Sequence, residues 1–191
     1  MFAVMQIAME RSRQLKEATM IPNIQKILYA TDLSPNAVYA LRYAMNSALK
    51  HDAEVIILHV LEDVDPASQV MLDLYIDEKR HKKIVDEHAA EAKNLIMDRL
   101  RAIRDKELKD HPEVADKVIS IEVCEGFPAE RILSKAEELA CDEIIMGTHS
   151  KGVIANTFLG STAKRVLRRT RKPVFIIPLP NGETDVSVDD M

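Results

Sequence analysis

Tryptophan is absent from the sequence, and aromatic residues make up only 4% of its 191 residues. Proteins that bind single-stranded nucleic acid stack bases on aromatic side chains, so no stacking platform is expected. Positive charge is also in deficit, since the formal net charge is −5 at pH 7. Because phosphate backbones are bound by clustered Lys and Arg, nucleic acid is not expected as the main partner.

Cysteine is scarce, and long apolar runs do not occur. Cys124 and Cys141 have no metal-ligand spacing, and we expect both to be buried thiols of a reducing compartment. No apolar run reaches the roughly 20 residues that a membrane-spanning helix needs. The charges of the N-terminal segment follow its short apolar start, which is the wrong order for a secretory signal. The expectation is a cytoplasmic protein with no membrane partner.

The chain length fits one ordinary domain with a real core. Residues 1–20 are predicted to form an N-terminal helical extension, because apolar side chains recur on one side of a helix drawn through them. The main domain is expected over 21–180, because the helical pattern is interrupted around Pro22. Residues 181–191 are acidic and are expected to form a disordered tail.

Five short apolar runs alternate with segments of helical periodicity. The second run, from 53 to 61, is apolar nearly throughout, as a strand covered on both faces requires. The alternation predicts an α/β fold: an open, doubly wound, five-stranded parallel sheet, Rossmann-like, with helices on both faces. The predicted strands span 24–31, 53–61, 116–124, 142–148 and 173–179.

The helical segments carry start and stop signals. Ser34 suits an N-cap and Pro35 the first helical position. A long helix from about Lys79 to Leu108 would run roughly 45 Å, so part of it is expected to project from a small sheet or to meet another subunit. His111-Pro112 is predicted to stop it. Further helices are expected after the turn Gly126-Phe127-Pro128 and over 161–172.

Glycine is also rare, yet three of the five glycines fall in the stretch GTHSKGVIANTFLGST, which spans 147–162. Gly160-Ser161-Thr162 opens a helix there, where free N–H groups and the helix dipole favour an anion. Gly147 would let the backbone pass close to a ligand. Neither a Walker A loop nor a GxGxxG motif is present. Asp32 follows the first strand, and the two loops would meet over one crevice if their strands are neighbours.

These residues match a known pattern. ILYATDLS, IILHVLE, the Gly-Phe-Pro turn and above all G-x2-G-x9-G-[ST] carry the match, the last one reading Gly147, Ser150 and Gly160-Ser161 here. The chain resembles the universal stress protein family, in particular its ATP-binding branch, over about residues 21–179. The resemblance implies the strand order 3-2-1-4-5 and a bound ATP, ADP or AMP, with Mg²⁺.

The resemblance also implies roles for individual positions. The turn around Ala30 and Asp32 would hold the nucleoside, Val60 would line the adenine pocket, and Met146-Gly147 would lie beside the ribose and phosphates. No metal site is expected from the protein alone, although Asp32 could offset phosphate charge through Mg²⁺. The candidate nucleotide-binding residues are Ala30, Thr31, Asp32, Val60, Met146, Gly147, His149, Ser150, Gly160, Ser161 and Thr162.

One position departs from the family pattern, because Ser150 stands where the second glycine is expected. A left-handed backbone there would strain serine by roughly 1–2 kcal/mol. If the glycine serves only close approach, the serine side chain can turn aside and donate its hydroxyl. His149 could contact phosphate, but a solvent-facing loop histidine explains it equally well.

The last predicted strand, Val174–Ile177, is apolar on both faces and carries no charge. The resemblance places it at the sheet edge, where an unprotected strand invites pairing with a second copy. A homodimer through this strand is therefore expected.

Two further features have plain explanations. His81 and His88 lie seven residues apart on the long helix, which is not the i, i+4 spacing of a zinc site. A basic run is interpreted as the solvent face and C-terminal end of a short helix, where cations suit the dipole. The run comprises Lys164, Arg165, Arg168, Arg169, Arg171 and Lys172.

Three functions remain in view. The leading one is a nucleotide-binding regulatory dimer of the stress response that is not an enzyme. The alternatives are a slow ATPase or phosphotransferase, and an interaction module that binds no nucleotide. The loop contains no recognisable water-positioning residue or arginine finger, which disfavours the enzyme. Closure of the pocket by Ser150 would favour the interaction module.

Overall fold

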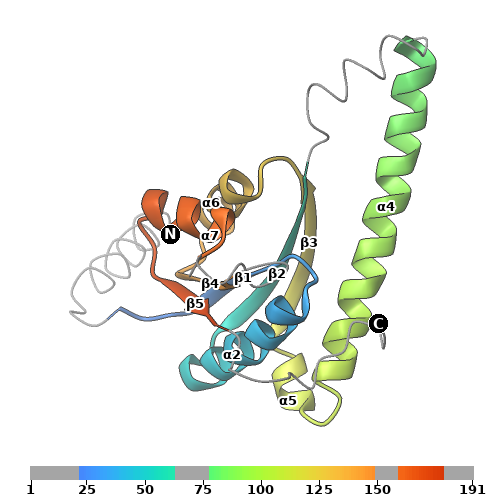
Figure 1. Ribbon diagram of the computed structural model, residues 1–191. Helices are drawn as coiled ribbons and strands as arrows, with labels where there is room; N and C mark the ends of the chain where they lie inside the picture. Colours follow the sequence, from blue (N-terminus) through green and yellow to red (C-terminus); the bar gives the residue numbers. More distant parts are fainter. Residues whose placement is uncertain (1–21, 63–77, 149–158, 179–191) are drawn as a thin grey trace, which may run out of the picture.

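A five-stranded parallel sheet forms the centre of the protein (Figure 1). The computed structural model describes residues 22–62, 78–148 and 159–178, with the side chains of 35–36 and 78–89 left out. The strand order β3-β2-β1-β4-β5 confirms the predicted fold. Each strand is slightly shorter than its apolar run. The strands are β1 Lys26–Thr31, β2 Glu54–Leu61, β3 Val118–Glu125, β4 Glu143–Gly147 and β5 Val174–Ile177.

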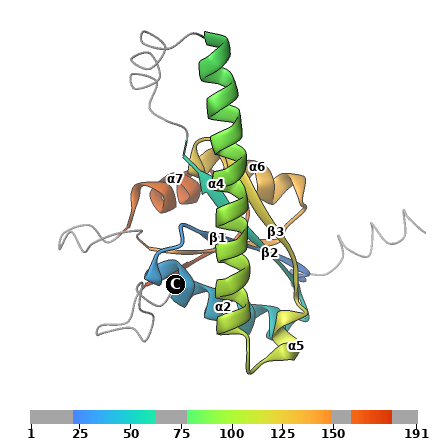
Figure 2. The same ribbon diagram turned by 90° about the vertical axis from the view of Figure 1, so that its right-hand side faces the viewer.

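Helices cover both faces of the sheet, as Figures 1 and 2 show. One face packs against α2 (Pro35–His51), α4 (Glu78–Glu107) and the short α5 (Pro112–Ala115). The other face packs against α6 (Pro128–Glu138) and α7 (Ser161–Arg169).

The alternation of side chains along β1 divides the core into two layers. Ile27 and Tyr29 face α2, whereas Leu28 and Ala30 face α6 and α7. All four are buried, because β1 lies in the middle of the sheet with a helical layer on each side. This explains why the strand reads as a continuous apolar run rather than as an alternating one.

The start of α2 follows the predicted signals. Ser34 is the N-cap, and its Oγ accepts a hydrogen bond from the N–H of Ala37 at 3.2 Å. Pro35 occupies the first turn, where its missing N–H costs nothing. The Tyr29 hydroxyl donates to the carbonyl of Ala37, which ties this first turn to β1. The sheet and the helix that follows it are thus joined at the edge where β1 ends.

Helix α4 extends well past the sheet, as the prediction of a projecting helix required (Figures 1 and 2). Among its described side chains, Leu100 and Ile103 near the C-terminal end are buried in the core, whereas Leu95 is 72% exposed. The predicted end of the helix, at about Leu108, is right to within one residue, but the role of His111-Pro112 as a stop is wrong. The helix ends at Glu107, and Pro112 begins α5, which the sequence analysis missed. A proline is favourable in the first turn of a helix, so His111-Pro112 marks a start rather than an end.

Two further expectations concern the cysteines and the ends of the chain. Cys141 is buried, and burial raises the pKa of its thiol to about 11. Cys124 is only partly buried, which corrects the expectation of two buried thiols; desolvation still raises its pKa. The predicted helical extension over 1–20 and the acidic tail over 181–191 lie outside the described residues. Within the described ranges, no helix combines the length and apolar character needed to cross a membrane.

Candidate functional site

A pocket of about 470 Å³ opens at the carboxyl ends of β1, β2 and β4. The chain winds from β1 outward to β3 and then crosses to β4 on the other side of β1, so the winding direction reverses between β1 and β4. In open parallel sheets this reversal leaves a crevice, because the loops on either side of it turn toward opposite faces. The pocket lies at this point, and its volume is in the ordinary range for small-molecule sites.

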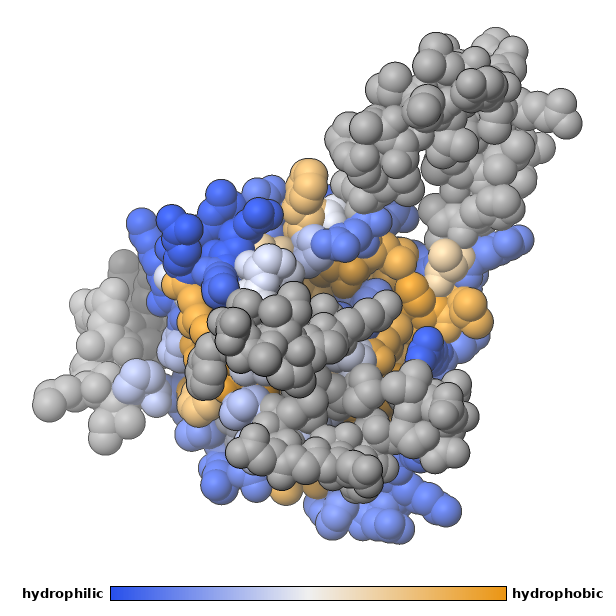
Figure 3. All heavy atoms as spheres, in the orientation of Figure 1, coloured by the Kyte–Doolittle hydropathy of each residue, from blue (hydrophilic) through white to orange (hydrophobic). Residues whose placement is uncertain are grey.

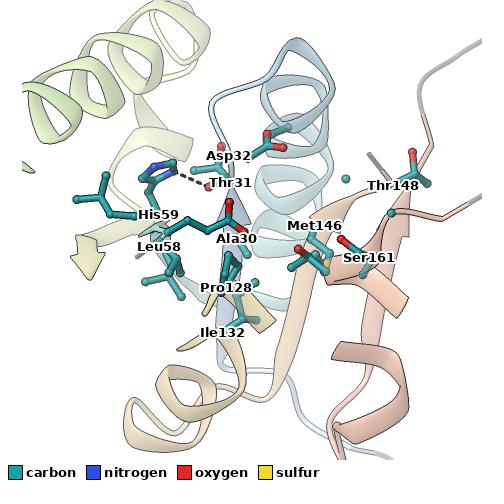
Figure 4. A pocket seen from close by; sticks show the side chains of 18 residues that line it. Ala30, Thr31, Asp32, Leu58, His59, Pro128, Ile132, Met146, Thr148 and Ser161 are labelled. Atoms are coloured by element: carbon teal, nitrogen blue, oxygen red, sulfur yellow. Dashed lines mark hydrogen bonds between the residues drawn. The ribbon is translucent and has the colours of Figure 1, made fainter. Parts of the chain in front are cut away.

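The loop from β1 to α2 forms one wall. Its shape is held by its own side chains: Thr31 Oγ1 accepts from the N–H of Leu33 at 3.1 Å, and Asp32 Oδ1 accepts from the N–H of Ser34 at 2.9 Å. Leu33 has a φ of 64°, a left-handed conformation that is unfavourable for leucine. The loop therefore holds a sharp turn that presents the exposed Asp32 carboxylate at the pocket (Figure 4).

His59 of β2 supports this wall from the neighbouring strand. Its Nδ1 lies 2.8 Å from the carbonyl oxygen of Thr31, and the two residues are also register partners in the sheet (Figure 4). A carbonyl oxygen only accepts, so Nδ1 carries the proton and donates it to this bond. His59 was not among the predicted site residues, although it stands next to Val60 within IILHVLE.

The opposite wall is the start of α7. The N–H of Gly160 donates to the carbonyl of Thr148 at 2.8 Å, and the N–H of Thr148 donates to the carbonyl of Ile177 at 3.2 Å. Gly160 is the N-cap of α7, and no side chain of the described residues caps the helix. Because the Gly160 amide is already used, the donors left for a ligand are those of the first turn, from Ser161 to Ala163.

The floor of the pocket is apolar. Met146 and Ala30 come from the middle of the sheet, and Ile132 and Pro128 from the start of α6 (Figure 4). Leu58 is almost fully buried, whereas Val60 is partly exposed at the pocket. The pocket is thus amphipathic, with an apolar floor between a carboxylate on one side and main-chain amides on the other.

Most predicted site residues lie together. The structure places nine of them around this pocket, whereas His149 and Ser150 lie outside the described residues. The signal for Pro128 and Ile132 was present in the sequence, in the turn after the third strand, but only the fold brings that turn to the pocket. The nine are Ala30, Thr31, Asp32, Val60, Met146, Gly147, Gly160, Ser161 and Thr162.

The charged side chains that line the pocket are acidic. Asp32 and Glu62 both line it, and none of its described lining residues is Lys or Arg. An anionic ligand would therefore depend on main-chain amides, on the α7 dipole and on a bound cation rather than on basic side chains. No group of three or more metal-binding side chains occurs among the described residues. The side chains of His81 and His88 are outside that description.

Known proteins share this architecture. A model of the Universal stress protein family matches residues 23–178. Universal stress protein MJ0577 of Methanocaldococcus jannaschii is 32% identical over 158 residues, which cover 83% of this chain and 97% of the relative. Universal stress protein MJ0531 of the same organism is 31% identical over 162 residues, covering 83% of this chain and 85% of the relative. A solved structure of MJ0577 superposes with a TM-score of 0.61 at 30% identity, covering 84% of this chain and 99% of that one.

The sheet order and the pocket at the strand reversal define a doubly wound α/β protein of the kind that places ligands beyond the carboxyl ends of its strands. Within this class of α/β proteins, one family is identified by two findings. Its model matches most of the chain, and relatives from it are at least 30% identical. The chain belongs to the universal stress protein family.

Proposed function

We propose that this protein is an adenine-nucleotide-binding regulator of the stress response that acts as a cytoplasmic homodimer. The ligand is ATP, with ADP or AMP as the shorter forms. The observation that carries this proposal is the amphipathic pocket at the strand reversal, where an apolar floor separates the Asp32 carboxylate from the amides that open α7. A flat base fits the floor, ribose hydroxyls fit a carboxylate, and phosphates fit the start of a helix.

Magnesium fits this arrangement as part of the ligand. Mg²⁺ is bound in such sites by one or two carboxylates together with phosphate oxygens, and it keeps several waters. Asp32 supplies an exposed carboxylate of the required kind. A phosphate chain beside Asp32 and Glu62 would otherwise meet like charge, so the cation would offset the repulsion.

The homodimer is supported by the place of β5. Among the described strands it lies at the edge of the sheet beside β4, and its sequence VFII carries no charge that would discourage pairing. Phe175 is 52% exposed. A second copy pairing along β5 would satisfy the free edge and cover this side chain.

The binding proposal is tested on the ligand itself. Purified protein is heat-denatured, and the released small molecules are identified by mass spectrometry. A second, folded sample freed of bound ligand is titrated with ATP by calorimetry, with and without Mg²⁺. We expect a released adenine nucleotide, and binding that Mg²⁺ strengthens. An empty supernatant together with no calorimetric signal would show an interaction module without nucleotide. Steady hydrolysis that Asp32→Ala abolishes would show a slow ATPase.

A further inference from the structure

Helix α7 presents an exposed cationic face that the pocket does not use. Ala163 and Val166 are buried against the sheet, so the opposite side of the helix faces solvent. That side carries Lys164, Leu167 and Arg168 at the i, i+3, i+4 spacing of a single helix face. The exposed Arg171 follows two residues after the end of the helix at Arg169. Figure 3 shows the strongly hydrophilic surface over this part of the molecule.

Part of the positive charge on this face is unpaired. Arg169 forms an ion pair with Glu130 at 3.1 Å, and Lys172 with Glu137 at 3.4 Å, so α6 neutralises these two cations. Within the described ranges, the other cations of the run make no ion pair: Lys164, Arg165, Arg168 and Arg171.

Leu167 adds an apolar element to this face. It lies among the unpaired cations and is 41% exposed. The chain as a whole carries a net charge of −5, so this concentration of positive charge is local. The face therefore suits an acidic segment that also carries apolar side chains.

The chain itself supplies such a segment close by. Two main-chain hydrogen bonds, from Thr148 to Ile177 and from Gly160 to Thr148, hold the end of β5 beside the start of α7. Residues 179–191 follow directly and lie outside the described residues. They contain no Lys or Arg, and they place Val186 and Val188 among four acids: Glu183, Asp185, Asp189 and Asp190.

The geometry of the attachment allows contact along the whole face. Thirteen extended residues reach about 43 Å at 3.3 Å each, whereas the nine residues of α7 span about 14 Å. Isolated surface ion pairs are weak. A tether this short nevertheless gives the segment a local concentration in the millimolar range, so several weak contacts suffice for docking.

We propose that residues 181–191, which we call the acidic tail, dock in cis on the cationic face formed by Lys164, Arg165, Leu167, Arg168 and Arg171. The four carboxylates face the four unpaired cations, and the valines cover Leu167. This inference depends on neither nucleotide binding nor dimer formation.

Cross-linking tests the contact in the full chain. A carbodiimide joins a carboxylate to an amine in direct contact, and Lys164 is the one lysine of the cationic face. We expect cross-links from the tail acids to Lys164 in preference to Lys106, an exposed lysine of α4. Raising NaCl from about 0.1 M to 1 M shortens the Debye length from about 10 Å to about 3 Å, and the cross-links should be lost. Equal yields at the two lysines, or yields that ignore salt, would overturn the proposal.

Isotope mixing and matched variants complete the test. In an equal mixture of ¹⁴N- and ¹⁵N-labelled protein, docking in cis gives cross-links within one label only, and mixed-label products would show docking in trans and refute the proposal. Asp189→Asn with Asp190→Asn should shift the amide resonances of Leu167 and Arg168. The control pair Glu91→Gln with Asp110→Asn removes the same charge from exposed sites elsewhere and should leave them unchanged. Identical α7 spectra for the tail variant and the parent protein would exclude docking.

Discussion

Thr31 and Asp32 show how individual residues shape the pocket wall. The N–H groups that follow β1 are taken up by side chains of the loop itself, and the carbonyl of Thr31 is held by a histidine from β2. Each such bond contributes only about 1 kcal/mol, but together they hold Leu33 in a left-handed conformation. The carboxylate of Asp32 is therefore positioned before any ligand binds, which lowers the entropic cost of binding.

His59 provides the sharpest test of this positioning. His59→Phe keeps a ring but removes the Nδ1–H donor, so we expect the affinity for ATP to fall by about tenfold, the equivalent of one hydrogen bond. His59→Asn places an amide N–H near the position of Nδ1 and should restore most of the affinity. Calorimetry measures both. Phe and Asn variants with the same affinity would show that the hydrogen bond to Thr31 does not matter for binding.

Gly160 tests the phosphate end of the pocket. Its φ of −64° and ψ of 162° are open to any residue, so valine brings no backbone strain. We expect Gly160→Val to retain the melting temperature while the added methyl groups block an anion at the start of α7 and abolish ATP binding. Ser161→Ala leaves the main-chain donors in place and should weaken binding by less than about tenfold. Near-parent affinity in both variants, measured by calorimetry, would rule out a phosphate at this helix.

At the scale of whole elements, β5 and α4 leave apolar side chains uncovered in different ways. Phe175 lies on a strand that has no neighbour on its outer side among the described residues. Leu95 lies on a helix, whose main chain satisfies its own hydrogen bonds. A second copy gains both hydrogen bonds and apolar contact at β5, but only apolar contact at α4. The strand is therefore the better place for self-association.

This difference predicts the effect of charge at each element. Phe175→Glu removes one Phe contact from each subunit of the proposed dimer, about 1.5 kcal/mol apiece, so its dissociation constant should rise on the order of 100-fold. Leu95→Glu introduces the same charge on α4 and should leave the dimer intact. Light scattering after size-exclusion chromatography reports the mass of each variant. A Phe175→Glu protein that stays dimeric at low concentration would place the interface elsewhere.

At the scale of the whole molecule, stability depends on a carboxyl group far from the pocket. Glu143 begins β4 and is fully buried under α2, where its Oε1 accepts from the Ser47 hydroxyl at 3.1 Å. Its Oε2 has no hydrogen-bond partner among the described residues. Burial raises the pKa of Glu143, and the Ser47 hydrogen bond and the charge of His51 only partly oppose this. Folding therefore makes this carboxyl group harder to ionise than it is in the unfolded chain.

The sign of the pH effect follows from this raised pKa. Below about pH 4.3 the carboxyl group is protonated in both folded and unfolded chains, and its contribution to stability is complete. As the pH rises, the unfolded chain ionises first, so stability is lost up to the folded-state pKa. Glu143→Gln has no proton to lose. We therefore expect the difference in unfolding free energy, variant minus parent, to increase as the pH rises from 4 to 8. Urea denaturation measures both free energies. A difference that is constant with pH would contradict the assignment.

Local patterns were sufficient for every described element except α5 and for most of the predicted residues that line the pocket. Ser34 and Pro35 predict the start of α2 because capping depends on only a few neighbouring residues. The apolar runs predict all five strands because a strand buried on both faces needs continuous apolar residues. Asp32 and Gly160 could be identified because each stands at the end of such an element, and the resemblance to the family added their partners.

The remaining features depend on distances that no local pattern contains. His59 joined the site because β2 lies in register beside β1, and Ile132 because α6 packs under the same strand ends. No local pattern marks Glu143 as a buried carboxylate, because its burial depends on the packing of α2 against β4. Periodicity and capping are properties of neighbouring residues, so the sequence alone determines where most of the helices and strands form. Which loops converge on one pocket, and which charge loses its water, is decided only when the strand order 3-2-1-4-5 brings distant segments into contact.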